Sequence, residues 1–75
     1  MTQSVMLVKI SSKLTASFIK EVKSKEGVIN VYPVFGRFDA VAFIEGKNFP
    51  EMTDVTLKII QTKGIRSTET FTEAI

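Results

Sequence analysis

The segment from Val28 to Glu45 constrains the fold more than any other part of the sequence. It contains two runs rich in β-branched and aromatic residues, separated by a break that carries Gly36 and Asp39. This pattern predicts a β-hairpin. In the second run, residues 40–44, apolar side chains occupy both alternating sets of positions. A strand with one face in water alternates apolar with polar residues, so this strand is expected to be buried on both faces.

Two more strands and two helices are expected around the hairpin. Residues 4–10 are apolar on both alternating sets and predict another strand that is covered on both faces. Helical spacing predicts one helix that runs up to Gly27 and a second over 49–62, and residues 65–75 predict a last strand. The apolar helix positions are Leu14, Phe18, Ile19 and Val22, then Met52, Val55, Ile59 and Ile60.

Polar residues mark the expected helix starts. Ser11 and Ser12 offer hydroxyls for the N-cap of the first helix. Asn48 precedes Pro50 and is followed by a glutamate three residues on, which resembles a capping box at the start of the second helix.

The element order is β-α-β-β-α-β, the ferredoxin-like arrangement of an α+β fold. Two right-handed crossovers place both helices on one face of a four-stranded antiparallel sheet. The usual strand order, 4-1-3-2, makes the first and third strands central, in agreement with their doubly apolar pattern. Pro33 lies in the second strand, which this order places at an edge, where a missing N–H donor is tolerated. In the last strand, alternation puts Ile65, Phe71 and Ile75 on one face and the threonines on the other.

Such a sheet leaves one apolar face uncovered. Four strands about 4.8 Å apart and roughly 20 Å long present on the order of 400 Å², a patch size that marks a binding surface. A domain of 75 residues is marginally stable alone, and the absence of cysteine and histidine excludes disulfides and nearly every zinc or haem site. We therefore expect one domain, residues 1–75, that forms an obligate homodimer through the open sheet face.

Charge and hydropathy narrow the partners further. The net charge is +2, but the lysines of segment 13–25 are interleaved with Glu21 and Glu26, which is typical of a solvated helix face. No apolar run approaches the roughly 20 residues of a membrane span, and no signal peptide opens the chain. We expect a soluble, cytoplasmic protein that binds neither membranes nor nucleic acid directly.

No catalytic residue, metal ligand or cofactor site is expected, because no two carboxylates lie at the spacing of a catalytic dyad. The hairpin break has simple structural explanations. Gly36 supplies a positive φ, Asp39 can cap turn amides, Phe38 can belong to the core, and Arg37 can be a solvated loop residue.

Taken together, these features resemble the ligand-sensing domain of the Lrp/AsnC family, called the RAM domain. The resemblance rests on a valine-rich strand, a G-x-[FY]-D motif at 36–39, an apolar strand, an amphipathic helix and a threonine-alternating strand at 67–72, and it covers essentially the whole chain. Family members add an N-terminal helix-turn-helix. Seven residues precede Val8 here, so the chain is similar to stand-alone RAM proteins.

The resemblance implies dimers that assemble into rings, with an effector, typically a free amino acid, between dimers near the motif and the last strand. Carried over by position, the ligand-binding residues are Gly36, Phe38 and Asp39, with Thr68 and Thr70 as wall residues. A zwitterion needs donors for its carboxylate and acceptors for its ammonium, and these groups supply both. High β propensity alone also explains the two threonines.

The expected function is therefore a non-enzymatic sensor in transcriptional or metabolic regulation that associates with full-length Lrp/AsnC regulators. Arg37 and Pro33 depart from the usual residues beside the motif, and Arg37 either favours an acidic effector or points outward. The alternative is a small dimeric α+β barrel enzyme with its active site in the sheet cavity. A central polar pocket, with Tyr32 or Glu45 pointing into it, would favour the enzyme.

Overall fold

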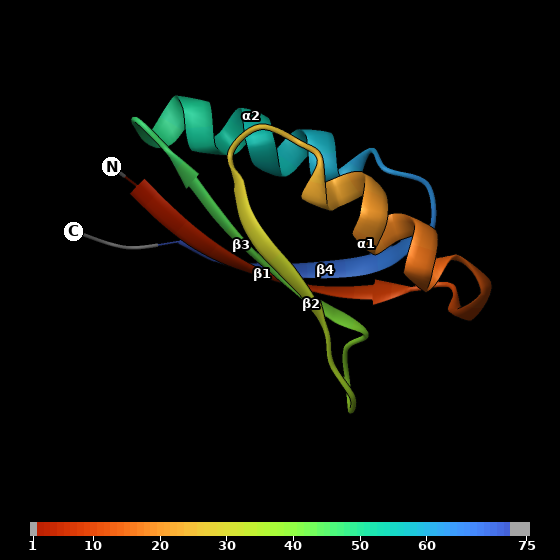
Figure 1. The fold of residues 1–75 in the computed structure, drawn as a ribbon. Helices are drawn as coiled ribbons and strands as arrows, with labels where there is room; N and C mark the ends of the chain where they lie inside the picture. The colour runs from red at the N-terminus through yellow and green to blue at the C-terminus, as the bar shows by residue number, and fades with distance from the viewer. Residues whose placement is uncertain (1, 73–75) are drawn as a thin grey trace.

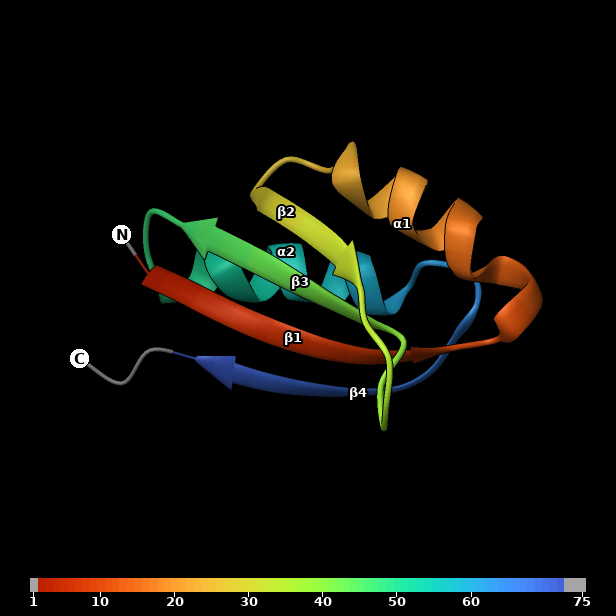
Figure 2. The same ribbon diagram turned by 60° about the horizontal axis from the view of Figure 1, so that its bottom comes forward.

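A computed structural model describes residues 2–72 and shows a four-stranded antiparallel sheet with two helices on one face (Figure 1). The strand order is β2-β3-β1-β4, as the sequence predicted. In chain order the elements are β1 (Thr2–Ile10), the 3-10 helix η1 (Ser12–Leu14), α1 (Thr15–Lys23), β2 (Val28–Pro33), β3 (Ala40–Gly46), α2 (Phe49–Ile60) and β4 (Ile65–Thr72). Figure 2 shows β1 and β3 side by side in the middle of the sheet. Pro33 ends β2, which is an edge strand.

The hydrophobic core lies between the sheet and the helices. Along β1 and β3, alternate side chains point to the helices and are almost completely buried, among them Val8 and Ala42. Phe18 and Val22 of α1 cover one part of this layer. The remaining core side chains are Met6, Ile10, Val31, Ala40, Ile44, Met52, Val55 and Ile59. Each large one contributes about 1.5–3 kcal/mol by leaving water.

The helix starts differ in how well the sequence predicts them. The side chain of Asn48 accepts a hydrogen bond from the Glu51 N–H at 2.9 Å, which confirms the predicted cap of α2. The prediction for α1 was wrong, because η1 intervenes and Leu14 occupies the N-cap position without a side-chain hydrogen bond. Both helices also end earlier than predicted, at Lys23 and Ile60.

Two apolar positions face the opposite way from the prediction. Ile60 is 41 % exposed and lies outside the core stripe of α2. In β4, a register shift opposite Lys9 and Ile10 turns Ile65 toward the core, whereas Phe71 pairs with Val5 and stays exposed. Ile65 and Phe71 therefore lie on opposite faces. Ile75, assigned to the same set, lies outside the described residues.

Candidate functional site

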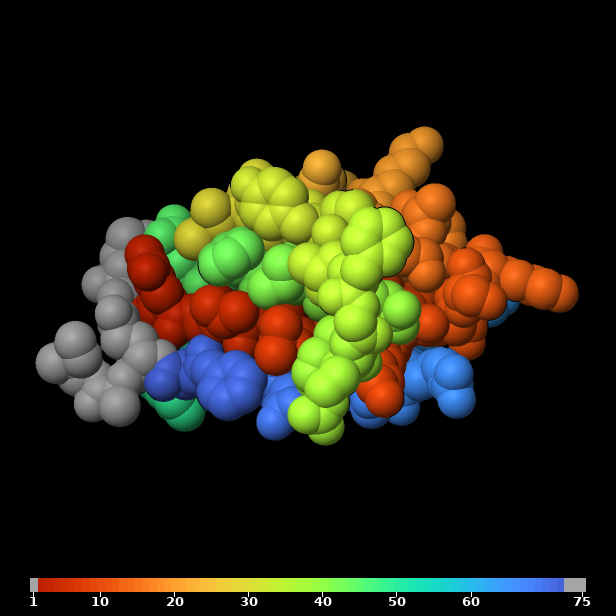
Figure 3. Space-filling model, turned by 90° about the horizontal axis from the view of Figure 1, so that it is seen from below, coloured from red at the N-terminus to blue at the C-terminus, as the bar shows by residue number. Residues whose placement is uncertain are grey.

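The sheet face opposite the helices is open to solvent and partly aromatic (Figure 3). Tyr32, Phe43 and Phe71 remain 48 %, 37 % and 56 % exposed on β2, β3 and β4. The rings of Tyr32 and Phe43 meet edge to face with centroids 6.0 Å apart, and the Tyr32 hydroxyl accepts a hydrogen bond from Asn30 Nδ2 at 2.7 Å. These contacts hold Tyr32 and Phe43 in place on an uncovered surface.

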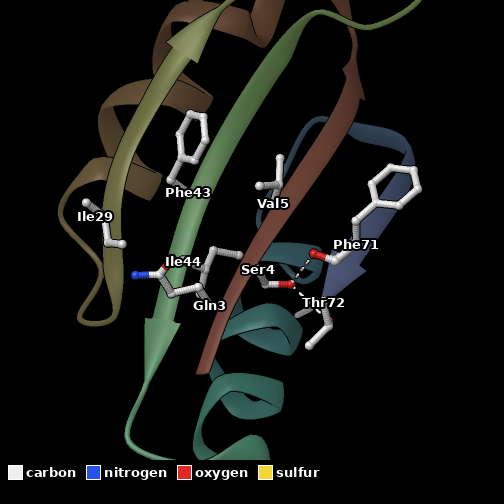
Figure 4. Close-up of a pocket in the computed structure, with 8 residues that line it drawn as sticks. All are labelled: Gln3, Ser4, Val5, Ile29, Phe43, Ile44, Phe71 and Thr72. Atoms are coloured by element: carbon white, nitrogen blue, oxygen red, sulfur yellow. Dashed lines mark hydrogen bonds between the residues drawn. The ribbon is translucent and has the colours of Figure 1, made fainter. Parts of the chain in front are cut away.

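A hollow of about 310 Å³ lies at one end of this face (Figure 4). Its wall is mostly hydrocarbon. It is lined by Gln3, Ser4, Val5, Ile29, Phe43, Ile44, Phe71 and Thr72. The Ser4 hydroxyl is already engaged, since it lies 3.1 Å from the Phe71 carbonyl oxygen and 3.0 Å from Thr72 Oγ1. Neither Tyr32 nor Glu45 belongs to this lining, so the hollow lacks the polar groups that the enzyme alternative requires.

The loop between β2 and β3, residues 34–39, projects from the sheet on the side away from the helices (Figure 1). Asp39 anchors its base. The Asp39 N–H donates to the Val8 carbonyl at 2.8 Å, and the Asp39 carbonyl accepts from the Val34 N–H at 3.0 Å. Its carboxylate Oδ2 accepts from the Ile10 N–H at 2.8 Å. Asp39 therefore caps the end of β1 and does not cap amides of its own turn.

The remaining motif residues lie farther out on the loop. Gly36 has a φ of 121°, as the tight-turn prediction required, and a Cβ there would meet open space. Phe38 is partly buried and does not belong to the buried core cluster. Arg37 is exposed as well. The structure thus presents the loop to solvent and fixes it to the sheet through Asp39.

The two threonines lie on the other face of the sheet. Thr68 pairs with Val8 and Thr70 with Met6, and both of these β1 side chains point into the core below the helices. Asp39 and Thr68 flank Val8 from opposite sides, but within one copy the sheet separates the two threonines from Gly36 and Phe38. The β4 residues on the same face as the loop are Ser67, Glu69 and Phe71.

A basic hollow of about 490 Å³ lies next to the anchored end of β1. Ser11 follows Ile10, whose N–H the Asp39 carboxylate holds, and Ser11 lines this hollow together with Lys13 and Arg66. The other lining residues are Ser12, Leu14 and Lys63. Cationic and hydroxyl groups that can bind an anionic ligand therefore lie one residue along the chain from the N–H that the Asp39 carboxylate binds, although Asp39 itself does not line the hollow. The sequence did not indicate this, because the two segments meet only in the fold.

Between residues 2 and 72, no cluster of three or more metal-binding side chains is found. No helix in that range is long and apolar enough to cross a membrane.

The reading of the sequence also missed Phe35, which is fully exposed on the loop. The sequence signal that could have identified Phe35 is a large apolar residue in the break between two predicted strands.

Comparison with solved structures shows the same fold in several proteins. The chain superimposes on TTHA0845 from Thermus thermophilus with a TM-score of 0.91 and 26 % identity, covering 100 % of this chain and 95 % of that one. The hypothetical protein PHS023 from Pyrococcus horikoshii gives a TM-score of 0.90 at 18 % identity, with 100 % and 92 % covered. E. coli AsnC gives a TM-score of 0.86 at 20 % identity, and the match covers 96 % of this chain but 50 % of AsnC.

A search of curated protein sequences found no match. The family model of the Lrp/AsnC ligand binding domain, however, matches residues 3–72, nearly the full length of the chain. This agrees with the motif at 36–39 and with the fold, and it points to a regulatory sensing module. The chain therefore belongs to the Lrp/AsnC ligand binding domain family.

Proposed function

We propose that this RAM domain is cytoplasmic and senses a free amino acid or a related metabolite. It acts as a homodimer formed through the open sheet face, and the dimers assemble into rings. It does not bind DNA by itself and instead associates with full-length Lrp/AsnC regulators. E. coli AsnC matches the chain over half of its own length, so such a regulator contains a domain of the same shape.

The position of Asp39 carries the ligand proposal. One carboxylate oxygen holds the Ile10 N–H at 2.8 Å, which fixes the direction of the side chain. An ionised carboxylate has about four lone-pair sites, so it can also accept hydrogen bonds from a ligand ammonium group. A fixed acceptor is preorganised, which reduces the entropy that binding would otherwise cost.

The basic hollow supports the same ligand class. Lys13 and Arg66 contribute positive charge next to Ser11, and guanidinium and ammonium groups bind carboxylates by charge-assisted hydrogen bonds. A free amino acid carries both charges on one small framework. Gly36 and Phe38 on the loop, and Thr68 and Thr70 on β4, are the further ligand contacts in this proposal. Because the sheet separates these two pairs within one copy, they contact the ligand from neighbouring dimers of the proposed ring.

The open face supports the dimer. Tyr32 and Phe43 are held by their mutual contact within one copy yet remain exposed, and apolar patches of this kind mark association surfaces. A two-fold dimer uses the same patch twice, so a single surface is sufficient.

A thermal-shift screen of the common amino acids tests the sensing role. A ligand that binds only the folded state stabilises it by about 2.7 kcal/mol at a hundredfold excess over Kd. We expect Asp39→Asn, which keeps an acceptor for Ile10 but loses the charge, to abolish the shift. Asp54→Asn, which changes an exposed aspartate on α2, should leave the shift intact. If no amino acid shifts the wild-type transition, or if Asp39→Asn retains the shift, the proposal is wrong.

Two further measurements test assembly and DNA binding. Light scattering at micromolar concentration should give at least twice the mass of one chain. The purified protein should not retain a labelled DNA duplex at physiological salt. Proteins that bind DNA nonspecifically still have measurable affinity under these conditions.

A further inference from the structure

Phe35 is the most exposed large apolar side chain of the described residues. It belongs to the β2–β3 loop, residues 34–39, which projects on the open-face side of the sheet, and Figure 3 shows this loop standing over the face. Burying a phenylalanine removes about 150–250 Å² from water, so a fully solvated one forgoes a large stabilisation. The loop itself is anchored through Asp39, which makes Phe35 a projecting apolar group on a fixed base.

The apolar hollow lies at the other end of the same face. The loop base pairs with Val8, whereas the hollow is lined by Gln3 and Val5 near the start of β1. Strands rise about 3.3 Å per residue, so Val8 lies roughly 10 Å from Val5 and roughly 16 Å from Gln3 along β1. Phe35 is fully exposed and is not among the lining residues, so it does not fill the hollow of its own copy.

In a dimer, the Phe35 of one copy can reach the hollow of the other copy. A two-fold axis that lies in the plane of the face and runs across the strands brings the loop end of each copy over the hollow end of the other. Both contacts then form at once, because a two-fold interface is self-complementary. No other chain is needed to supply the projection or the hollow.

The size of the face points the same way. The flat sheet surface offers on the order of 400 Å², about half of the roughly 800 Å² that each partner buries in a typical stable interface. Two loops that reach across the interface, each burying a phenylalanine, supply much of the difference.

We infer that Phe35 of each copy inserts into the partner copy's hollow, beside Ile29, Phe43 and Phe71. This inference rests on the proposed homodimer and specifies which surfaces complete it. The hollow of a single chain is then one half of a site, and the loop of the second chain is the other half.

Cysteine cross-linking tests the contact directly, because the sequence contains no cysteine. A Phe35→Cys chain and an Ile29→Cys chain of different tag length are mixed, refolded together and treated with diamide. We expect a mixed disulfide dimer, since the two positions meet across the interface. Phe35→Cys mixed with Phe49→Cys is the control, because Phe49 is also exposed but starts α2 on the helix side. If the yield of the mixed disulfide dimer is no higher than in this control, the inference is wrong. It is also wrong if Phe35→Cys couples preferentially to itself, because that would place the two loops together.

Sedimentation equilibrium separates this inference from the dimer itself. Phe35→Ala should raise the dimer Kd at least tenfold while circular dichroism stays unchanged, because Phe35 packs on nothing within its own copy. Phe49→Ala should leave the Kd unchanged. A wild-type dimer that Phe35→Ala does not weaken overturns the insertion alone. A monomeric wild type overturns the proposed dimer as well.

Discussion

The carboxylate of Asp39 and the backbone N–H of Ile10 form a hydrogen bond of 2.8 Å across 29 positions of sequence. It joins the base of the β2–β3 loop to the end of a central strand, at the point where the regular pairing of β1 with β3 has stopped. The loop direction, and with it the candidate ligand site, depends on this contact.

Replacing Asp39 with alanine should lower the free energy of unfolding by about 1–3 kcal/mol, because the half-buried Ile10 N–H loses its acceptor. Asp39→Asn should cost less, since an amide oxygen can replace the carboxylate oxygen. Urea unfolding of the three proteins measures the difference. Equal midpoints for alanine and wild type would show that the hydrogen bond does not stabilise the fold.

Phe43→Glu should convert the dimer into a monomer, because it places a charge in the aromatic centre of the open face. Phe49→Glu is the matched control, since Phe49 is exposed at the start of α2, where a negative charge is tolerated. Light scattering reports the mass of each. A dimeric Phe43→Glu protein would exclude this face as the interface.

Asn48→Ala should destabilise the protein by about 1 kcal/mol, because the Glu51 N–H at the start of α2 loses its cap. Asn48→Asp should restore most of the stability, since aspartate caps helices equally well. Thermal unfolding distinguishes the two, and identical transitions for alanine and aspartate would contradict the capping role.

Ile59→Ala should cost about 2–5 kcal/mol, because Ile59 is completely buried between α2 and the sheet. The neighbouring Ile60→Ala removes the same atoms from a position that is 41 % exposed and should cost far less. Chemical denaturation of both variants compares the two sites. Similar losses would mean that Ile60 is also covered, by a second copy.

The fold followed from local patterns because most elements obey them. The doubly apolar β1 and β3 had to be central, and Pro33 had to lie on an edge, which together select the observed strand order. The Asn48 cap was predictable because it involves residues only three positions apart.

The sequence could not predict which side of the sheet a residue of β4 faces where a register shift intervenes. A single irregularity opposite Lys9 and Ile10 moves Ile65 to the core while Phe71 remains on the open face. An alternation pattern read through the whole strand places both on one face, since a shift of one residue inverts every side chain beyond it.

The candidate site was predictable only in part. The motif residues Gly36 and Asp39 were identified, but the actual partner of the Asp39 carboxylate was not, because Ile10 is distant in sequence. The sequence allowed Phe38 to belong to the core, but it is only partly buried and lies outside the core cluster, because an aromatic side chain in a loop gives no local indication of which way it points.

The central place of β1 also determines when the sheet can be completed during synthesis. β1 leaves the ribosome first, yet its neighbours are β3 and β4, and the Ser4 hydroxyl reaches Phe71 across 67 positions. Topologies dominated by such distant contacts have high contact order and fold slowly. We expect one edge of the apolar β1 to stay unpaired in the nascent chain until β4 has emerged, so that holdase chaperones have their longest access to this strand.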